Sequence, residues 1–199
     1  MKTIYLVRHG ETEWNKLGKL QGWLDSELTE LGVQQARALQ YTFQGMDIDT
    51  VYSSDLGRAI STARLIVPAQ EPVIDARLKE IFLGEWQGKE LQYLERDPCY
   101  EQYVCSPQSF QPTTQETFQS VANRMHACLQ SVAQKNEKNI IMVSHGIAIH
   151  CLLWKLSGER LHSLSDLIPS CGVVKLNYCD GIWEIQEFTL RKVQNTYLQ

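Results

Sequence analysis

Residues 4–10 read Ile-Tyr-Leu-Val-Arg-His-Gly, a short apolar run that ends in two basic side chains and a glycine. Two later stretches have the same form: residues 50–55 read Thr-Val-Tyr-Ser-Ser-Asp, and residues 140–146 read Ile-Ile-Met-Val-Ser-His-Gly. Continuous apolar runs of this kind are typical of strands that are covered on both faces. The three stretches therefore predict buried parallel strands that each end in polar residues.

Stretches with helical spacing of apolar residues separate these strands. Thr29 is expected to cap a helix that ends before Gly45, and a second helix follows residues 50–53 and stops at Pro68. A further helical run, residues 147–156, is expected to end at Gly158.

The strongest helical pattern lies in the second half of the chain. Thr113 with Glu116 three positions later forms a capping-box pattern, which predicts the start of this helix. Its apolar residues then follow on one stripe: Phe118, Val121, Ala122, Met125, Cys128, Leu129 and Val132.

The end of the chain has a different pattern. Val174, Leu176 and Tyr178 alternate with polar residues, and Asp180-Gly181 predicts a tight hairpin into residues 182–188. The predicted fold is therefore α/β, a three-layer α/β/α sandwich on a mostly parallel sheet with a late antiparallel hairpin. We expect one domain over residues 1–199, in which residues 83–112 form a partly helical insertion that acts as a lid.

Composition excludes several classes of function. The chain has 199 residues, 43% of them hydrophobic, and 19 basic against 23 acidic residues give a formal net charge of −4. This balance speaks against binding to nucleic acid, which requires clustered positive charge. The six cysteines form no Cys-x-x-Cys pair, as in a cytoplasmic protein with reduced thiols. No stretch approaches the roughly 20 apolar residues that a membrane span requires.

Basic side chains lie where the predicted strands end. Arg8 and His9 follow the first strand, Arg58 lies shortly after the second, and His145 follows the third. Ligands of open parallel sheets bind at the carboxyl ends of the strands, so these side chains are expected to converge. Two arginines and two histidines suit a phosphate group, whereas the arginines would repel a metal ion. One of the histidines could attack phosphorus, because adjacent guanidinium groups lower its pKa and keep it neutral. Glu80, among apolar neighbours, is a candidate proton donor.

The same residues lie in motifs that resemble those of the histidine phosphatase superfamily, the phosphoglycerate-mutase-like enzymes. The resemblance is carried by residues 6–15 (LVRHGETEWN), 21–29, 53–63, 78–88 and 143–146. Within the superfamily, the chain most resembles the compact branch, which includes broad-specificity and α-ribazole phosphatases. It implies that His9 is the nucleophile that becomes phosphohistidine and that Glu80 donates a proton. It further implies that phosphate is bound by Arg8, Arg58, His145, Asn15 and Gln21, and that His145 also acts in catalysis by polarising the transferred group. The Gly146 N–H, at a helix start, is placed to add a donor. The resemblance implies no metal or organic cofactor.

Three functions remain open at this stage. The insertion holds only two cations, Lys89 and Arg96, while Trp86, Tyr93, Tyr100, Tyr103 and Phe110 are expected to give an apolar leaving-group pocket. This favours a phosphatase of a small phosphorylated metabolite over a phosphoglycerate mutase. A catalytically silent module that binds a phosphorylated ligand is the third alternative. Glu116 is either part of the pocket or a helix cap, and the oligomeric state is open.

Overall fold

The computed structural model describes residues 1–94, 96–158, 164 and 167–186. Within them, six strands form one sheet in the order β3-β2-β4-β1-β5-β6. Their bounds are β1 Lys2–Arg8, β2 Thr50–Ser53, β3 Val73–Ile74, β4 Asn139–Ser144, β5 Val173–Cys179 and β6 Ile182–Gln186. The helices are α1 Glu13–Lys16, α2 Glu30–Phe43, α3 Gly57–Ile66, α4 Leu91–Leu94, α5 Pro98–Cys105, α6 Phe118–Ala133 and α7 Gly146–Ser157, with short 3-10 turns at Ala76–Leu78 and Gly84–Trp86.

The sheet is mixed. Strands β3, β2, β4 and β1 run parallel, whereas β5 pairs antiparallel with both β1 and β6. Arg8 on β1 lies opposite Ser144 on β4, and the Ser54 N–H just after β2 donates to the Val143 carbonyl at 3.0 Å. Strands β1, β2 and β4 therefore end at the same edge of the sheet, and the polar residues that follow them begin side by side at this edge.

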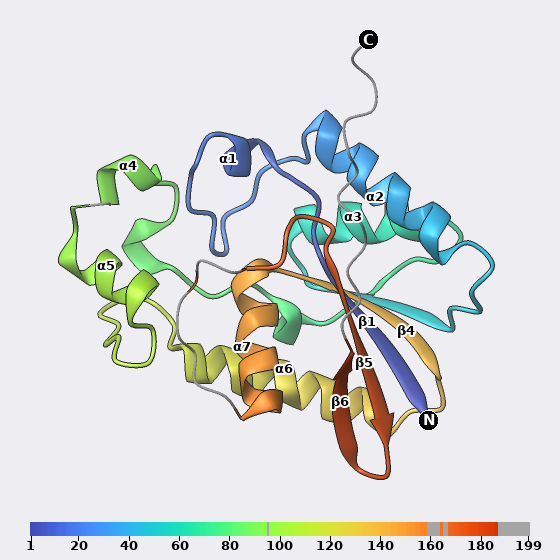
Figure 1. Ribbon diagram of the computed structural model, residues 1–199. Coiled ribbons are helices and arrows are strands. Elements are labelled where there is room, and N and C mark those ends of the chain that lie inside the picture. The colour runs from blue at the N-terminus through green and yellow to red at the C-terminus, as the bar shows by residue number, and fades with distance from the viewer. Residues whose placement is uncertain (95, 159–163, 165–166, 187–199) are drawn as a thin grey trace.

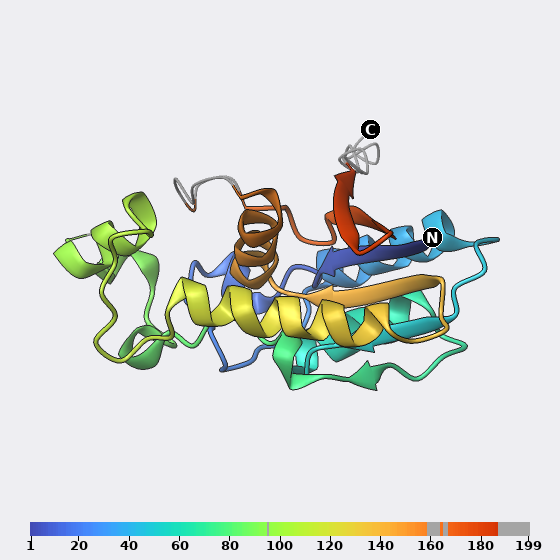
Figure 2. The ribbon, with the colours of Figure 1, turned by 90° about the horizontal axis from the view of Figure 1, so that it is seen from below.

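Helices cover both faces of the sheet, and each face has its own hydrophobic core (Figures 1 and 2). One core contains Ile4, Leu6 and Ile140 with the buried faces of α6 and α7, and the other contains Tyr5, Val7 and the buried faces of α2 and α3. Successive side chains of a strand point to opposite faces, which explains why neighbouring residues of β1 belong to different cores. The predicted α/β architecture with helices on both faces of the sheet is confirmed.

The start of α6 differs from the sequence prediction. The predicted capping box at Thr113 and Glu116 is wrong: the cap is Thr117, whose side chain accepts a hydrogen bond from the Ser120 N–H, and the helix begins at Phe118. The apolar stripe of this helix is buried as predicted. The boundary was misplaced because Thr117 also has the chemistry of a cap, and Glu116 pairs with a more distant residue instead of with Thr113.

The late hairpin forms with a tight turn. Asp180 and Gly181 both have positive φ, 52° and 87°, as a two-residue turn of the I′ type requires. The second strand extends to Gln186, and residues 187–188 of the predicted strand lie outside the described residues.

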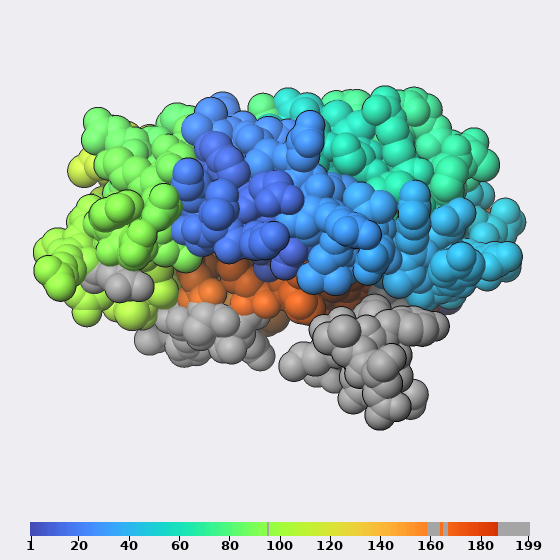
Figure 3. Space-filling model, turned by 90° about the horizontal axis from the view of Figure 1, so that it is seen from above, coloured from blue at the N-terminus to red at the C-terminus, as the bar shows by residue number. Residues whose placement is uncertain are grey.

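The insertion contains α4 and α5 and projects beyond the carboxyl ends of the strands (Figure 1). Backbone hydrogen bonds join it to the segment that follows β1: the Leu20 N–H donates to Lys89, and the Leu91 N–H donates to Gly18. In the view from above, the insertion (green) lies beside this segment (blue) (Figure 3). Among the described residues, no helix has the length and apolar character needed to cross a membrane.

The aromatic residues of the insertion do not form the predicted pocket surface. Trp86, Tyr103 and Phe110 are buried, and with Tyr100 and Phe118 they pack edge-on or stacked at ring-centre distances of 5.0–6.1 Å. Tyr93 is exposed. The prediction of an apolar leaving-group pocket is therefore wrong for Trp86, Tyr103 and Phe110, because these side chains belong to the hydrophobic core that also contains residues of the sheet, α6 and α7.

Candidate active site

The structure brings Arg8, His9, Arg58 and His145 together at the carboxyl edge of the sheet. The ring centres of His9 and His145 are 5.1 Å apart, and the Arg58 Nε lies 3.3 Å from the His9 Nε2. Arg8 is the last residue of β1 and His9 follows it, Arg58 belongs to the first turn of α3, and His145 links β4 to α7. The four residues therefore come from three parts of the chain, and the fold places them side by side.

A contact with the backbone of the next residue sets the orientation of the His9 ring. Its Nδ1 lies 2.7 Å from the Gly10 carbonyl, which can only accept, so Nδ1 carries the proton and Nε2 presents a lone pair. Gly10 is required at this position, since a Cβ there would lie 2.6 Å from the Gly32 carbonyl of α2. Burial, followed by the charges of Arg58 and Arg8, holds the pKa of His9 well below its usual value. His9 is therefore a neutral, oriented nitrogen base.

Most of the Arg58 guanidinium is held by protein groups. Its two Nη atoms donate to the carbonyls of Gly22 and Leu24, each at 2.8 Å, and to the Asp25 carboxylate at 3.0 Å. Asp25 also accepts from the Arg58 backbone N–H, so it caps α3 as well. Of its five N–H groups, three are held by these groups, the one on Nε donates to the His9 Nε2 at 3.3 Å, and one on Nη2 remains for an anion. Asp25 had been noted only as part of a motif, and its pairing with Arg58 depends on the fold.

Two buried nitrogen atoms of the cluster lack a partner among the described residues. They are Arg8 Nε and His145 Nδ1. Arg8 is anchored by its Nη1, which donates to the Ile168 carbonyl at 2.7 Å, and its guanidinium lies against Gly146, 3.3 Å from where a Cβ would be. Buried donors are nearly always paired, because an unpaired one costs about 1–3 kcal/mol. An unpaired N–H within a cationic cluster fits an anion, and the contact of these residues with phosphate stays a prediction.

Glu80 lies at the amino end of α7. Its Oε1 accepts from the Ala148 N–H and the Ile81 N–H, each at 2.9 Å, and its Oε2 accepts from the Ile147 N–H at 3.2 Å. Glu80 does not bind the first N–H of the helix, that of Gly146, which is therefore available to another acceptor. A carboxyl group and a phosphate group can therefore share this helix end, which favours negative charge.

The segment that carries Glu80 is clamped by Arg124 of α6. The Arg124 guanidinium pairs with both oxygens of Glu116 at 2.9 Å and donates to the carbonyls of Arg77, Lys79 and Glu80. Glu116 also accepts from the Phe82 N–H at 3.3 Å. Its contacts thus match neither of the two roles considered from the sequence. Arg124 was missed there because a single arginine on an amphipathic helix carries no local signal.

Asn15 and Gln21 make contacts that fix the loop after β1. The Asn15 Oδ1 accepts from the Thr12 N–H at 3.1 Å, which closes a capping box at the start of α1. The Gln21 Nε2 donates to the Thr12 Oγ1 at 2.9 Å, and its Oε1 accepts from the Ser26 hydroxyl at 3.3 Å. Both ends of the Gln21 amide are therefore engaged within the protein, and its predicted contact with phosphate stays a prediction.

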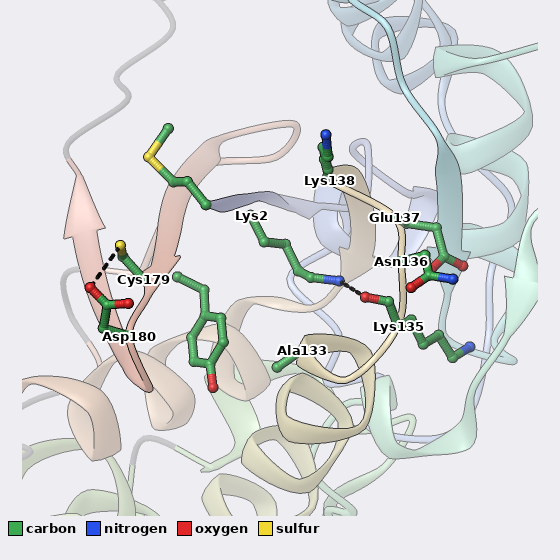
Figure 4. Close-up of a pocket in the computed structure, with 10 residues that line it drawn as sticks. Lys2, Ala133, Lys135, Asn136, Glu137, Lys138, Cys179 and Asp180 are labelled. Atoms are coloured by element: carbon green, nitrogen blue, oxygen red, sulfur yellow. Dashed lines mark hydrogen bonds between the residues drawn. The ribbon is translucent and has the colours of Figure 1, made fainter.

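A hollow of about 340 Å³ lies at the opposite end of the sheet, lined by residues that include Lys2, Lys135 and Asp180 (Figure 4). The Lys2 Nζ donates to the Lys135 carbonyl at 2.9 Å, so this lysine closes the end of α6 and is not directed at a ligand. None of the catalytic candidates lines this hollow. Among the described residues, no group of three or more His, Cys, Asp or Glu side chains could hold a metal ion.

Comparison with known proteins identifies the class to which this fold and cluster belong. Residues 4–191 match the family model of the histidine phosphatase superfamily, branch 1. The chain belongs to this superfamily, whose members here include phosphatases and mutase-like proteins, and the resemblance seen in the motifs is confirmed.

Individual relatives carry both kinds of name. A curated protein of Yersinia pestis, "Probable phosphoglycerate mutase GpmB", is 32% identical over 98% of this chain and 94% of its own length. The solved structure of Bacillus stearothermophilus YhfR has a TM-score of 0.87 at 31% identity, covering 93% of this chain and 95% of its own. An H9A mutant of Entamoeba histolytica phosphoserine phosphatase, in complex with phosphoserine, has a TM-score of 0.82 at 30% identity, covering 95% and 97%.

Proposed function

We propose that this protein is a phosphomonoester hydrolase that works through a phosphohistidine intermediate on His9. The observation that carries the proposal is the state of His9: its Nδ1 is bound to the Gly10 carbonyl, and its Nε2 lone pair faces the Nε–H of Arg58. A neutral imidazole beside fixed guanidinium groups combines a nucleophile with charge that stabilises a phosphoryl group.

The proposed reaction has two steps. The His9 Nε2 attacks phosphorus, the bond from phosphorus to the ester oxygen breaks, and Glu80 gives a proton to the leaving oxygen. Water then attacks phosphorus, the bond from phosphorus to the His9 Nε2 breaks, Glu80 takes up a proton of that water, and inorganic phosphate leaves. Arg8, Arg58, His145 and the Gly146 N–H hold the phosphoryl oxygens in both steps. Guanidinium groups supply the positive charge, so the proposed reaction requires no metal ion.

Hydrolysis is favoured over transfer to a second hydroxyl by the groups beside the pocket. The cations of the insertion, Lys89 and Arg96, are both exposed, and the nearby Lys79 is paired with Asp55 at 2.9 Å. These three cations therefore do not form a buried binding site for a substrate carboxylate. The phosphoserine complex of the Entamoeba relative supports a small phosphorylated metabolite as the substrate class.

Trapping the phosphoenzyme tests the proposal. Wild-type protein is mixed with a ³²P-labelled aryl phosphate in EDTA and quenched in alkali, which preserves phosphohistidine. We expect acid-labile label on the wild type and none on His9→Ala, whose kcat falls by on the order of 10³-fold or more. His126→Ala is the matched control, since this histidine bonds Gln130 on α6, and it should label normally. Label on His9→Ala, or turnover that EDTA abolishes, would contradict the mechanism.

The partition of the label decides between the remaining functions. For a phosphatase, the label passes to inorganic phosphate even when glycerate or a phosphoglycerate is added. For a mutase, the label passes to the acceptor faster than to water. Phosphate binding without any label or turnover would identify a silent binding module.

A further inference from the structure

His145 is buried, and its two ring nitrogens are in different situations. The Nε2 lies 2.7 Å from the Ser54 hydroxyl oxygen, while the Nδ1 has no partner among the described residues. The side chain is fully buried and follows the last residue of β4. A neutral imidazole carries one proton, so one nitrogen of His145 donates and the other accepts. Which nitrogen holds the proton decides what His145 can offer a phosphoryl oxygen.

Glu80 explains why the Nδ1 of His145 is unpaired. His145 is the cap residue of α7, and a cap side chain normally accepts from the second or third N–H of its helix. Here both of these donors, on Ile147 and Ala148, go to the Glu80 carboxylate. The Nδ1 is therefore released from helix capping, on a ring whose centre lies 5.1 Å from that of His9.

The Ser54 hydroxyl can be assigned from its second contact. The Leu56 N–H donates to the Ser54 Oγ at 3.1 Å, so Oγ already acts as an acceptor there. The remaining contact, to the His145 Nε2, is the place where the hydroxyl proton of Ser54 finds an acceptor. If the His145 Nε2 instead carried the proton and donated to the Ser54 Oγ, two unfavourable features would result. The buried hydroxyl proton of Ser54 would have no acceptor, and the unprotonated Nδ1 would face phosphoryl oxygens.

We infer that Ser54 is a positioning residue: it donates its proton to the His145 Nε2, holds His145 in the Nδ1–H form, and aims a neutral N–H donor at the transferred phosphoryl group. This inference rests on the proposed function for its ligand, and its chemistry is a hydrogen bond alone, with no proton transferred. Burial and the charge of Arg58 lower the pKa of His145 well below its usual value, which agrees with a neutral ring.

Spectroscopy of the resting protein tests this inference first. Long-range ¹H–¹⁵N spectra distinguish protonated from bare ring nitrogens, and the His145 signals are assigned by their loss in His145→Asn. We expect a protonated Nδ1 and a bare Nε2 at pH 7.5. A protonated Nε2 overturns the inference. The measurement needs no turnover, so its outcome is independent of whether His9 is phosphorylated.

A matched pair of variants then tests the role of the hydroxyl. Ser54→Thr and Ser54→Val have side chains of the same shape and differ in one hydroxyl group. We expect Thr to keep the Nδ1–H form and Val to lose it. The kcat/KM of the Val variant for an aryl phosphate should be about 10²-fold below that of the Thr variant, the scale of one misplaced donor. Orthovanadate should bind the Val variant about tenfold more weakly than the Thr variant.

Equal activity and equal vanadate binding of the two variants would overturn the inference. If the added methyl group unfolds both proteins, which melting curves would reveal, Ser54→Ala replaces them and is compared with the wild type. Ala removes the hydroxyl without added bulk, and the spectrum of its His145 ring must then differ from the wild type for the inference to stand.

Discussion

The polar cluster and the insertion lie next to each other, yet they are held together in opposite ways. In the cluster, Arg8, Arg58 and His145 are each fixed by hydrogen bonds to groups from other elements. In the insertion, Trp86 and Tyr103 are fixed by ring packing, within the hydrophobic core that also contains residues of α6 and α7. The proposed phosphoryl site therefore consists of directional contacts, whereas the buried rings of the insertion are part of a hydrophobic core.

The burial of the rings in the insertion limits which aromatic side chains can contact the leaving group of a substrate. Trp23 is 43% exposed, its Nε1 donates to the Glu80 carbonyl at 2.8 Å, and its ring packs on Phe82 at 4.9 Å. The Lys79 Nζ lies 4.4 Å from its ring centre. The loop after β1 thus places a partly exposed aromatic ring beside the segment that carries the proposed proton donor.

The largest effect is expected from Arg58→Ala, which removes a donor from the cluster and leaves the Asp25 carboxylate without its ion-pair partner. We expect kcat/KM to fall about 10³-fold, because the lost contacts act on the transferred phosphoryl group. Arg64→Ala is the control on the same helix, since Arg64 pairs with Glu71 at the surface. Steady-state kinetics of both variants test the prediction, and similar losses in the two would contradict it.

Trp86→Ala addresses the insertion. We expect the free energy of unfolding to fall by about 3 kcal/mol, because a buried aromatic ring is lost from its core. Inorganic phosphate should inhibit the folded variant as well as it inhibits the wild type. Tyr93→Ala, an exposed side chain in the same insertion, is the control for denaturant titrations. Weaker phosphate binding by Trp86→Ala would show that the two regions are not energetically separate.

The cluster should also make stability depend on pH. The pKa values of His9 and His145 lie well below 6.5 in the folded protein, mainly because of burial. The unfolded chain therefore binds more protons below pH 6.5, so stability is fully present above this pH and is lost as the pH falls. The slope is about 1.4 kcal/mol per pH unit for each histidine.

Urea titrations between pH 7.5 and 5 measure this slope. The window excludes carboxylates such as Asp75, whose pKa is lowered from 3.8 chiefly by its hydrogen bond to Arg77 and which titrates at lower pH. His9→Asn should remove about half of the slope. Stability that stays constant over this range would contradict the assignment of buried neutral rings.

The smallest effect concerns the clamp behind Glu80. Glu116→Gln removes the charge that pairs with Arg124, and we expect kcat to fall about fivefold with inhibition by phosphate unchanged. Glu71→Gln removes the partner of Arg64 at the surface and should leave kcat as it is. An effect of Glu116→Gln on phosphate inhibition equal to that on kcat would place Glu116 in the pocket after all.

Much of the fold could be predicted because its signals are local. The apolar runs of β1, β2 and β4, the turn at Asp180-Gly181 and the buried stripe of α6 all follow from side-chain spacing and turn chemistry. The start of α6 could not be fixed in this way, because two threonines offered equivalent caps. The insertion was misjudged because spacing gives the identity of an aromatic residue but not the partner it packs against.

The sequence by itself determined which groups would meet: basic residues that follow parallel strands must converge at the carboxyl edge of the sheet. Tertiary structure alone decided what each group can still offer. Asp25 and two carbonyls bind most N–H groups of the Arg58 guanidinium. Glu80 accepts the hydrogen bonds from the helix N–H groups that would otherwise go to the His145 side chain, and Ser54 binds the Nε2 of His145. The physical reason is that hydrogen bonds saturate. A donor's availability depends on every acceptor around it, and these acceptors are distant in the chain.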